Sequence, residues 1–188
     1  MSRTLPEYQI GHYYHLYNRG ANKGEIFFEE KNYHFLLKKV KKYTSSLSIS
    51  LIAYCLMPNH YHFLIRQDGN YTAGTFIQRI FNSYSKAVNK QYGREGTLFE
   101  GPYRAIHVDD RNYLIHLCRY IHRNPLEAHL VKNINDWPYS NYLEWINARK
   151  GSLYNPDLLQ HYFSSPEEYK QFVDDYKSPQ KIEQYLFE

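Results

Sequence analysis

The chain has only two cysteines among 188 residues, which is too few for a disulfide framework. Cys55 and Cys118 lie far apart in apolar segments, so we expect both to be buried free thiols. The N-terminus has no apolar signal core, and no apolar run approaches the roughly 20 residues that a membrane-spanning helix needs. These absences argue against a secreted disulfide scaffold or a membrane protein, and they predict a soluble cytoplasmic protein.

Tyrosine is the most over-represented residue, with 21 copies, and the formal charge of +4 with an isoelectric point near 8.8 is mildly basic. Tyrosine rings fill cores and also stack on unpaired bases, and a basic surface suits an anionic partner. The length allows one domain with an appended segment. We expect a domain over residues 1–150 and a polar, partly helical tail over residues 151–188.

The most informative pattern is a pair of histidines two positions apart, His60 and His62. They follow a Pro-Asn turn in a β-forming run, so residues 48–67 should form a strand, a tight turn and a second strand. Side chains two apart on a strand share a face, so both imidazoles should point together while Tyr61 and Phe63 face the other way. Such a pair can bind one divalent metal, but it also occurs on strands that bind none.

The other elements follow from hydrophobic periodicity and turn residues. We expect strands at residues 8–18 and 103–108, long helices at residues 29–46 and 75–92, and short helices at residues 140–147 and 165–173. Asp109 or Asp110 should cap a further helix that ends at Arg123, because Asn124 and Pro125 follow. Strand, helix, strand, strand, helix, strand is the order of a ferredoxin-like split βαβ sheet. The predicted fold is therefore α+β, with helices on one face of the sheet and an additional helix after it.

The additional helix carries Tyr113, Leu117, Tyr120 and Asn124 on one stripe, because positions three and four apart stack on a helical face. Taken alone, Tyr120 and Asn124 are compatible with a buried ring and an asparagine that caps the helix. A functional pair at the helix end is the alternative, and the spacing alone favours the buried ring and the cap.

Four sequence blocks, in order, resemble the single-tyrosine HUH transposases of the insertion-sequence-200 type, and in particular their REP-associated relatives. The blocks are residues 14–20 (YHLYNRG), 56–64 (LMPNHYHFL), 96–104 (GTLFEGPYR) and 120–128 (YIHRNPLEA), the last followed by WPYS at residues 137–140. Together they span about two thirds of the chain, from Tyr14 to Tyr142. The resemblance agrees with the ferredoxin-like order of elements.

The resemblance implies that His60 and His62 bind a divalent metal, Mg²⁺ or Mn²⁺, that Asn124 completes the metal site, and that Tyr120 is the catalytic nucleophile. It implies a 5′-phosphotyrosine intermediate on single-stranded DNA that carries hairpins. An asparagine at position 124 favours the REP-associated branch. The resemblance to the REP-associated branch implies a monomer, whereas resemblance to the insertion-sequence relatives implies a homodimer. His129 departs from the family, in which glycine is usual at that position.

Four arginines flank the expected site in sequence and are candidate DNA contacts: Arg94, Arg104, Arg119 and Arg123. Three other functions stay open at this point. One is a catalytically silent DNA-hairpin-binding protein, another is a ferredoxin-like RNA-binding module, and the third is a metal-dependent hydrolase that uses water. The set of His60, His62, Tyr120 and Asn124 argues against the first of these, because a binding protein needs none of them.

Overall fold

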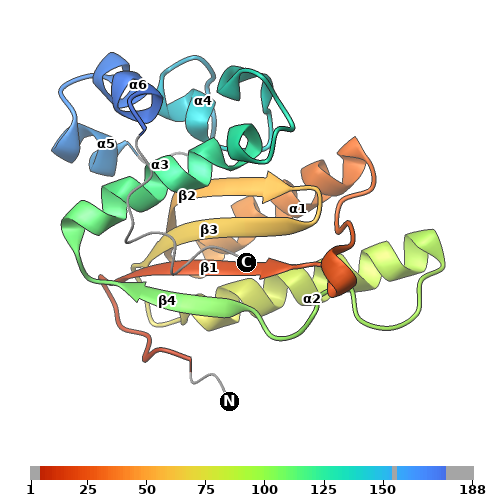
Figure 1. Ribbon diagram of the computed structural model, residues 1–188. Helices are drawn as coiled ribbons and strands as arrows, with labels where there is room; N and C mark the ends of the chain where they lie inside the picture. Colours follow the sequence, from red (N-terminus) through yellow and green to blue (C-terminus); the bar gives the residue numbers. More distant parts are fainter. Residues whose placement is uncertain (1–4, 154–155, 177–188) are drawn as a thin grey trace.

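The computed structural model describes residues 5–153 and 156–176. Four antiparallel strands form one sheet in the order β2-β3-β1-β4 (Figure 1). The strands are β1 (Tyr13–Arg19), β2 (Ile49–Met57), β3 (His60–Gln67) and β4 (Arg104–Val108). The helices are α1 (Glu30–Ser46), α2 (Ala73–Tyr92), α3 (Arg111–Glu127), α4 (Tyr142–Trp145), α5 (Asp157–Tyr162) and α6 (Pro166–Asp174), with 3₁₀ turns at Ala21–Lys23 and Ile134–Asp136.

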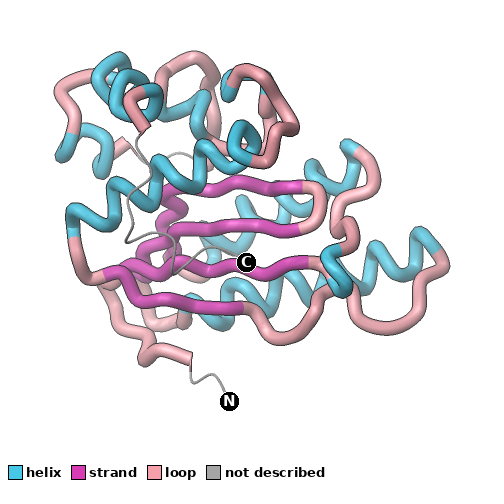
Figure 2. Tube along the Cα trace, viewed as in Figure 1, coloured by secondary structure: helices cyan, strands magenta, loops and turns pink. Residues whose placement is uncertain are grey.

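The helices divide between the two faces of the sheet. In Figures 1 and 2, α1 and α2 cover one face, and α3 lies on the other, alongside β2 with α4, α5 and α6 beyond it. This strand order and connectivity confirm the predicted ferredoxin-like α+β fold with an additional helix.

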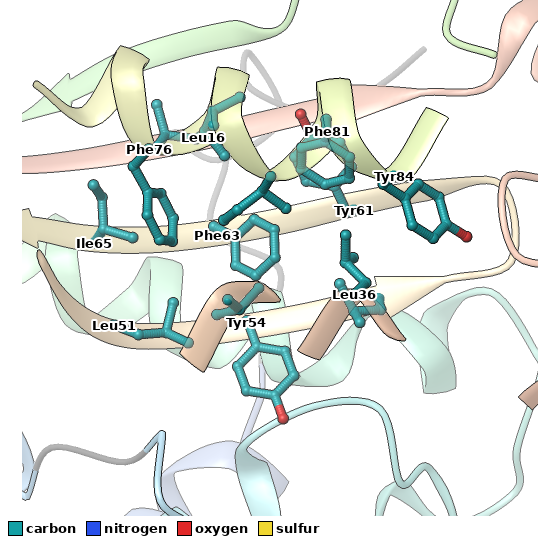
Figure 3. Close-up of a cluster of buried hydrophobic side chains, with 14 of the residues drawn as sticks. Leu16, Leu36, Leu51, Tyr54, Tyr61, Phe63, Ile65, Phe76, Phe81 and Tyr84 are labelled. Atoms are coloured by element: carbon teal, nitrogen blue, oxygen red, sulfur yellow. The ribbon is translucent and has the colours of Figure 1, made fainter. Parts of the chain in front are cut away.

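The face under α1 and α2 is an aromatic and aliphatic core. Strand side chains that alternate toward this face, among them Leu16, Tyr61 and Phe63, meet Phe76 and Phe81 from α2 (Figure 3). The Tyr61 and Phe81 rings stack with centroids 4.0 Å apart. Because the side-chain period of a strand is two, burying Tyr61 and Phe63 on this face directs His60 and His62 to the face of α3.

A second core lies between the sheet and α3. It contains both free cysteines, Cys55 and Cys118, which are fully buried as the sequence predicts. Tyr169 and Val173 of α6 are also fully buried there, so α6 packs against α3 with a hydrophobic face. The division of the chain at residue 150 stays a prediction, and the contacts show that part of the segment beyond it completes this second core.

The segment after α3 covers the edge strand β2. The backbone N–H of Leu56 donates to the Tyr139 carbonyl, and the side chain of Asn141 accepts from the backbone N–H of Tyr54. A bulge after Leu51 turns the Ile52 carbonyl out of the sheet, where Asn141 and Trp145 donate to it. The end of the WPYS block, together with Asn141 and Trp145 after it, therefore supplies hydrogen-bond partners to the edge strand β2.

The expected end of the third helix was wrong. Residue 125 lies inside α3, which continues to Glu127, because Pro125 removes only its own donor and the chain closes one turn later. The N–H of His129 donates to the Leu126 carbonyl, and that of Leu130 to the Pro125 carbonyl. This pair of hydrogen bonds is a Schellman motif, and it holds His129 at φ 55°, in the left-handed region.

Smaller differences concern element ends. β1 starts at Tyr13, five residues later than expected, and α5 was not predicted. The helix expected at residues 140–147 is confined to the four residues of α4. Within the described part of the chain, no helix combines the length and apolar character needed to cross a membrane.

Candidate active site

His60 and His62 open β3, directly after the tight turn that follows β2, and both point toward α3. Their ring centroids lie 5.1 Å apart with the planes at 85°. The predicted common direction of the two imidazoles is therefore confirmed. His62 is fully buried, whereas His60 lies at the partly exposed start of the strand.

Tyr120 and Asn124 of α3 face these histidines. The Asn124 Oδ1 atom lies 3.2 Å from His60 Nε2, and the Tyr120 ring meets the His62 ring edge to face with centroids 5.6 Å apart. Asn124 does not cap the helix, because the C-cap is Ala128. The fold thus brings together all four residues of the predicted catalytic and metal-binding set, from positions 60 to 124 of the chain.

Two amides fix the orientation of the His60 ring. Asn124 donates from Nδ2 to the Tyr120 carbonyl at 3.1 Å, which leaves its oxygen toward His60. Asn59 donates from Nδ2 to the Lys23 carbonyl, and its Oδ1 lies 2.7 Å from His60 Nδ1. The Asn59 and Asn124 oxygens can both only accept, and a neutral imidazole carries a single proton. When that proton is on Nδ1, against the nearer Asn59 oxygen, the Nε2 lone pair of His60 faces the Asn124 oxygen.

Burial controls the protonation of the site. It lowers the pKa of His60 and lowers the pKa of His62 well below its usual value, with the neighbouring His15 and His60 adding to the shift at His62. Burial also raises the pKa of Tyr120 to about 12, and a hydrogen bond with Asn124 opposes that rise. Both imidazoles are thus held neutral, which suits metal binding, and the phenol is protonated at neutral pH.

Two further residues, which were not predicted from the sequence, reach the site from β1. Tyr17 pairs with His62 across the strands, and His15 lies 2.9 Å from His62 through the Nε2 and Nδ1 atoms. Both belong to the first of the four sequence blocks. They are two residues apart on a strand, so alternation alone places them on the same face, and pairing of β1 with β3 brings that face to the histidines.

The four candidate arginines are not gathered at one place. Arg104 lies over the Tyr17 ring, 5.8 Å from its centroid, and is thereby beside the site. Arg94 lies over Phe28 at 5.4 Å. Arg119 is only 5% exposed and donates to the Phe172 carbonyl, and Arg123 donates to the Val173 carbonyl and to Glu127, so both hold α6 against α3. Their contact with DNA stays a prediction.

Comparison with known proteins places this geometry in a family. The family model described as "Transposase IS200 like" matches residues 8–124, from shortly before β1 to Asn124. This chain therefore belongs to the IS200-like transposase family. No curated relative matches the sequence.

One solved structure supports the same fold. A REP-associated tyrosine transposase bound to a REP hairpin matches with a TM-score of 0.67 and 16% identity, over 82% of this chain and 94% of that one. A putative transposase from Deinococcus radiodurans matches with a TM-score of 0.43 and 15% identity, over 65% and 95% of the two chains. The tRNA(His) guanylyltransferase of Saccharomyces cerevisiae matches with a TM-score of 0.45 and 11% identity, over 97% of this chain and 79% of that one.

Proposed function

We propose that this transposase cleaves and rejoins single-stranded DNA beside hairpins through a 5′-phosphotyrosine intermediate on Tyr120. The observation that carries the proposal is the convergence of Tyr120 with His60, His62 and Asn124 on one face of the sheet. The alternative is a DNA-hairpin-binding protein that performs no cleavage, for which this convergence has no use.

The donor atoms fit a divalent metal. With its proton on Nδ1, the neutral His60 ring directs its Nε2 lone pair toward the Asn124 oxygen at 3.2 Å, a separation close to that of two neighbouring ligands on an octahedral ion. The described residues contain no cluster of three His, Cys, Asp or Glu side chains that could hold a metal, so the proposed donor set includes an amide oxygen. Mg²⁺ or Mn²⁺ held by His60, His62 and Asn124 would polarise the scissile phosphate.

The protein residues supply the nucleophile and its direction. Tyr120 Oη forms the bond to phosphorus and loses its proton, while the bond from phosphorus to the 3′-oxygen breaks and that oxygen gains a proton. The phosphotyrosine bond keeps the energy of the phosphodiester, so attack by another 3′-hydroxyl rejoins a strand without ATP. Burial of Tyr120 between α3 and the sheet restricts the ring to a direction across His62, which favours in-line attack.

The DNA partner is proposed to be a hairpin with a single-stranded flank. The structurally similar REP-associated enzyme is bound to a REP hairpin, and a flexible single strand can bring its phosphate to a buried phenol more readily than a stiff duplex can. Arg104, beside Tyr17, is the best placed of the candidate arginines for a phosphate near the site. Whether the protein acts as a monomer or as a homodimer stays a prediction.

One experiment separates the candidate functions. The full chain is incubated with a labelled hairpin oligonucleotide that carries single-stranded flanks, with Mn²⁺ or with EDTA, and is run on a denaturing gel. The proposed function gives a covalent protein–DNA band that requires Mn²⁺ and shifts back after protease treatment. Free cleavage products without a covalent band would indicate a hydrolase, and retention only on a native gel would indicate the binding protein.

A further inference from the structure

His15 of β1 is hydrogen-bonded to the proposed metal ligand His62. Both rings are fully buried and stacked, with centroids 5.1 Å apart, and His15 Nε2 lies 2.9 Å from His62 Nδ1. The other nitrogen of His15, Nδ1, is buried and has no hydrogen-bond partner among the described residues. A fully buried polar ring with a single hydrogen bond is unusual, and nothing in the cleavage chemistry proposed above uses it.

The hydrogen bond between the two rings allows two arrangements of protons. A neutral imidazole carries one N–H, so either His15 donates from Nε2 to His62, or His62 donates from Nδ1 to His15. In the first arrangement His62 carries its proton on Nε2, and that nitrogen cannot bind a metal. In the second arrangement His62 presents a lone pair at Nε2, and the proton of His15 resides on Nδ1.

We propose that His15 is a positioning residue that holds His62 in the tautomer able to bind a metal, by accepting a hydrogen bond from His62 Nδ1. The inference rests on the proposed metal site and deepens it. A ligating histidine usually gives its other N–H to a carboxylate, a carbonyl or a water, and here a second imidazole takes that place.

The tautomers of the two proposed metal ligands, His60 and His62, depend on different neighbours. The Nδ1–H form of His60 is favoured by Asn59, whose amide is itself held by the Lys23 carbonyl. Among the residues that the structure describes, the ring of His15 has no second partner that would fix its own tautomer, so it can change together with His62. Binding of the cation therefore selects the proton arrangement of both rings at once, and His15 becomes the Nδ1–H form.

Nitrogen-15 NMR of the ¹⁵N-histidine-labelled full chain tests the tautomers directly, with Mg²⁺ as the probe. We expect the Mg²⁺-loaded protein to carry the His62 proton on Nδ1 and the His15 proton on Nδ1. A His62 proton on Nε2, or a His15 proton on Nε2, in the loaded protein would overturn the inference. This measurement needs no variant and no DNA.

Mn²⁺ affinity of purified variants, followed by electron paramagnetic resonance, gives a second test. His15→Leu should weaken Mn²⁺ binding by about 10- to 100-fold. His15→Gln, whose amide oxygen can accept from His62, should restore most of the affinity. His107→Leu is the matched control, because this β4 histidine pairs with His12 and lies on the other face; it should bind Mn²⁺ like the parent protein.

The outcomes separate the inference from the proposed function. If the parent protein binds Mn²⁺ and His15→Leu binds it equally well, the role of His15 is wrong and the metal site stands. The role of His15 is also wrong if His15→Gln binds as poorly as His15→Leu while melting like the parent protein. If the parent protein binds no Mn²⁺, the metal site of the proposed function fails and the role of His15 fails with it.

Discussion

The two faces of the sheet use the same strands but bury different chemistry. Toward α1 and α2, the strands present Leu16, Tyr61 and Phe63 to a core of rings and aliphatic chains. Toward α3, alternate positions of the same strands present His15 and His62, and both are as completely buried as the rings on the other side. Because neighbouring positions on a strand point to opposite faces, a shift of the register by one residue would exchange the two sets of side chains.

This difference shows where the fold depends on paired polar groups. A buried polar side chain is destabilising unless a partner satisfies it, and the face of α3 is arranged in such pairs. His15 pairs with His62, and His122 is held between the Tyr169 hydroxyl at 2.6 Å and the Asn141 oxygen at 2.9 Å. Substitutions and pH should therefore act more specifically on the face of α3 than on the face of α1 and α2.

The largest expected effect comes from Tyr120→Phe. Removal of one oxygen should abolish the covalent protein–DNA band, a loss of more than about a thousandfold, because no attacking atom remains. The ring still packs against His62, so the melting temperature and hairpin affinity should change little. A denaturing gel and a native gel measure the two properties on the same samples.

Two control variants make this comparison of faces sharper. Tyr61→Phe removes a fully buried hydroxyl from the opposite face and should leave the covalent band unchanged. Tyr17→Phe removes the tyrosine hydroxyl that lies across from His62 on β1. If Tyr17→Phe eliminates the adduct while Tyr120→Phe retains it, the nucleophile has been assigned to the wrong tyrosine.

The next largest effect is expected for His60→Ala. Loss of the imidazole that faces Asn124 should reduce cleavage by about a hundredfold, and EDTA should reproduce the effect with the parent protein. Hairpin binding should weaken only modestly, because Lys and Arg contacts with phosphates supply most of the affinity. Undiminished cleavage by His60→Ala in Mg²⁺ would contradict the metal site.

Much of the fold was predictable from the sequence because its signals are local. Alternation of apolar residues on the strands, helical spacing around Phe76 and Ile80, and the N-cap Asp110 each depend on a few neighbouring residues. The end of α3 was not predictable in this way, because Pro125 is a strong helix-stopping signal. The Schellman closure at His129 that follows it can be recognised only from the backbone.

The residues of the site also differ in whether local sequence or long-range packing determines them. The common direction of His60 and His62 follows from their spacing, whereas the roles of Tyr120 and Asn124 follow from the family blocks. His15 did not, because its role depends on the pairing of β1 with β3, which no local pattern specifies. The positions of Arg119 and Arg123 depend equally on long-range packing, since α6 lies some 50 residues further along the chain and takes up their donors.

A pH effect of intermediate size should appear on the face of α3. Burial lowers the pKa of His122 to about 4, whereas the unfolded chain has the ordinary value near 6.5. The unfolded state therefore binds more protons between these values, so stability is fully present above pH 6.5 and falls as the pH drops. Protonation of His122 alone should lower the free energy of unfolding by about 3 kcal/mol between pH 7 and pH 4.

Denaturant titrations at pH 7 and pH 4 measure this loss, and hydrogen exchange locates it. Amides of α3 should lose protection before those of α2, because the fully buried histidines of the described residues, His15, His62 and His122, all belong to the face of α3. Simultaneous loss of protection on both faces would show that acid acts on the whole domain and not on the polar pairs.

The smallest expected effect concerns how the two long helices end. Both α2 and α3 are followed by a left-handed residue, but α2 uses Gly93 at φ 59° and α3 uses His129 at φ 55°. A residue with a Cβ is strained there, so His129→Gly should raise the free energy of unfolding by about 1 kcal/mol. The reciprocal change Gly93→His should lower it by a similar amount, since a Cβ at Gly93 meets no atom within 4 Å and only the backbone strain remains.

Urea titrations of both variants check the pair. Destabilisation by His129→Gly would mean that the His129 side chain makes a stabilising contact that outweighs its backbone strain.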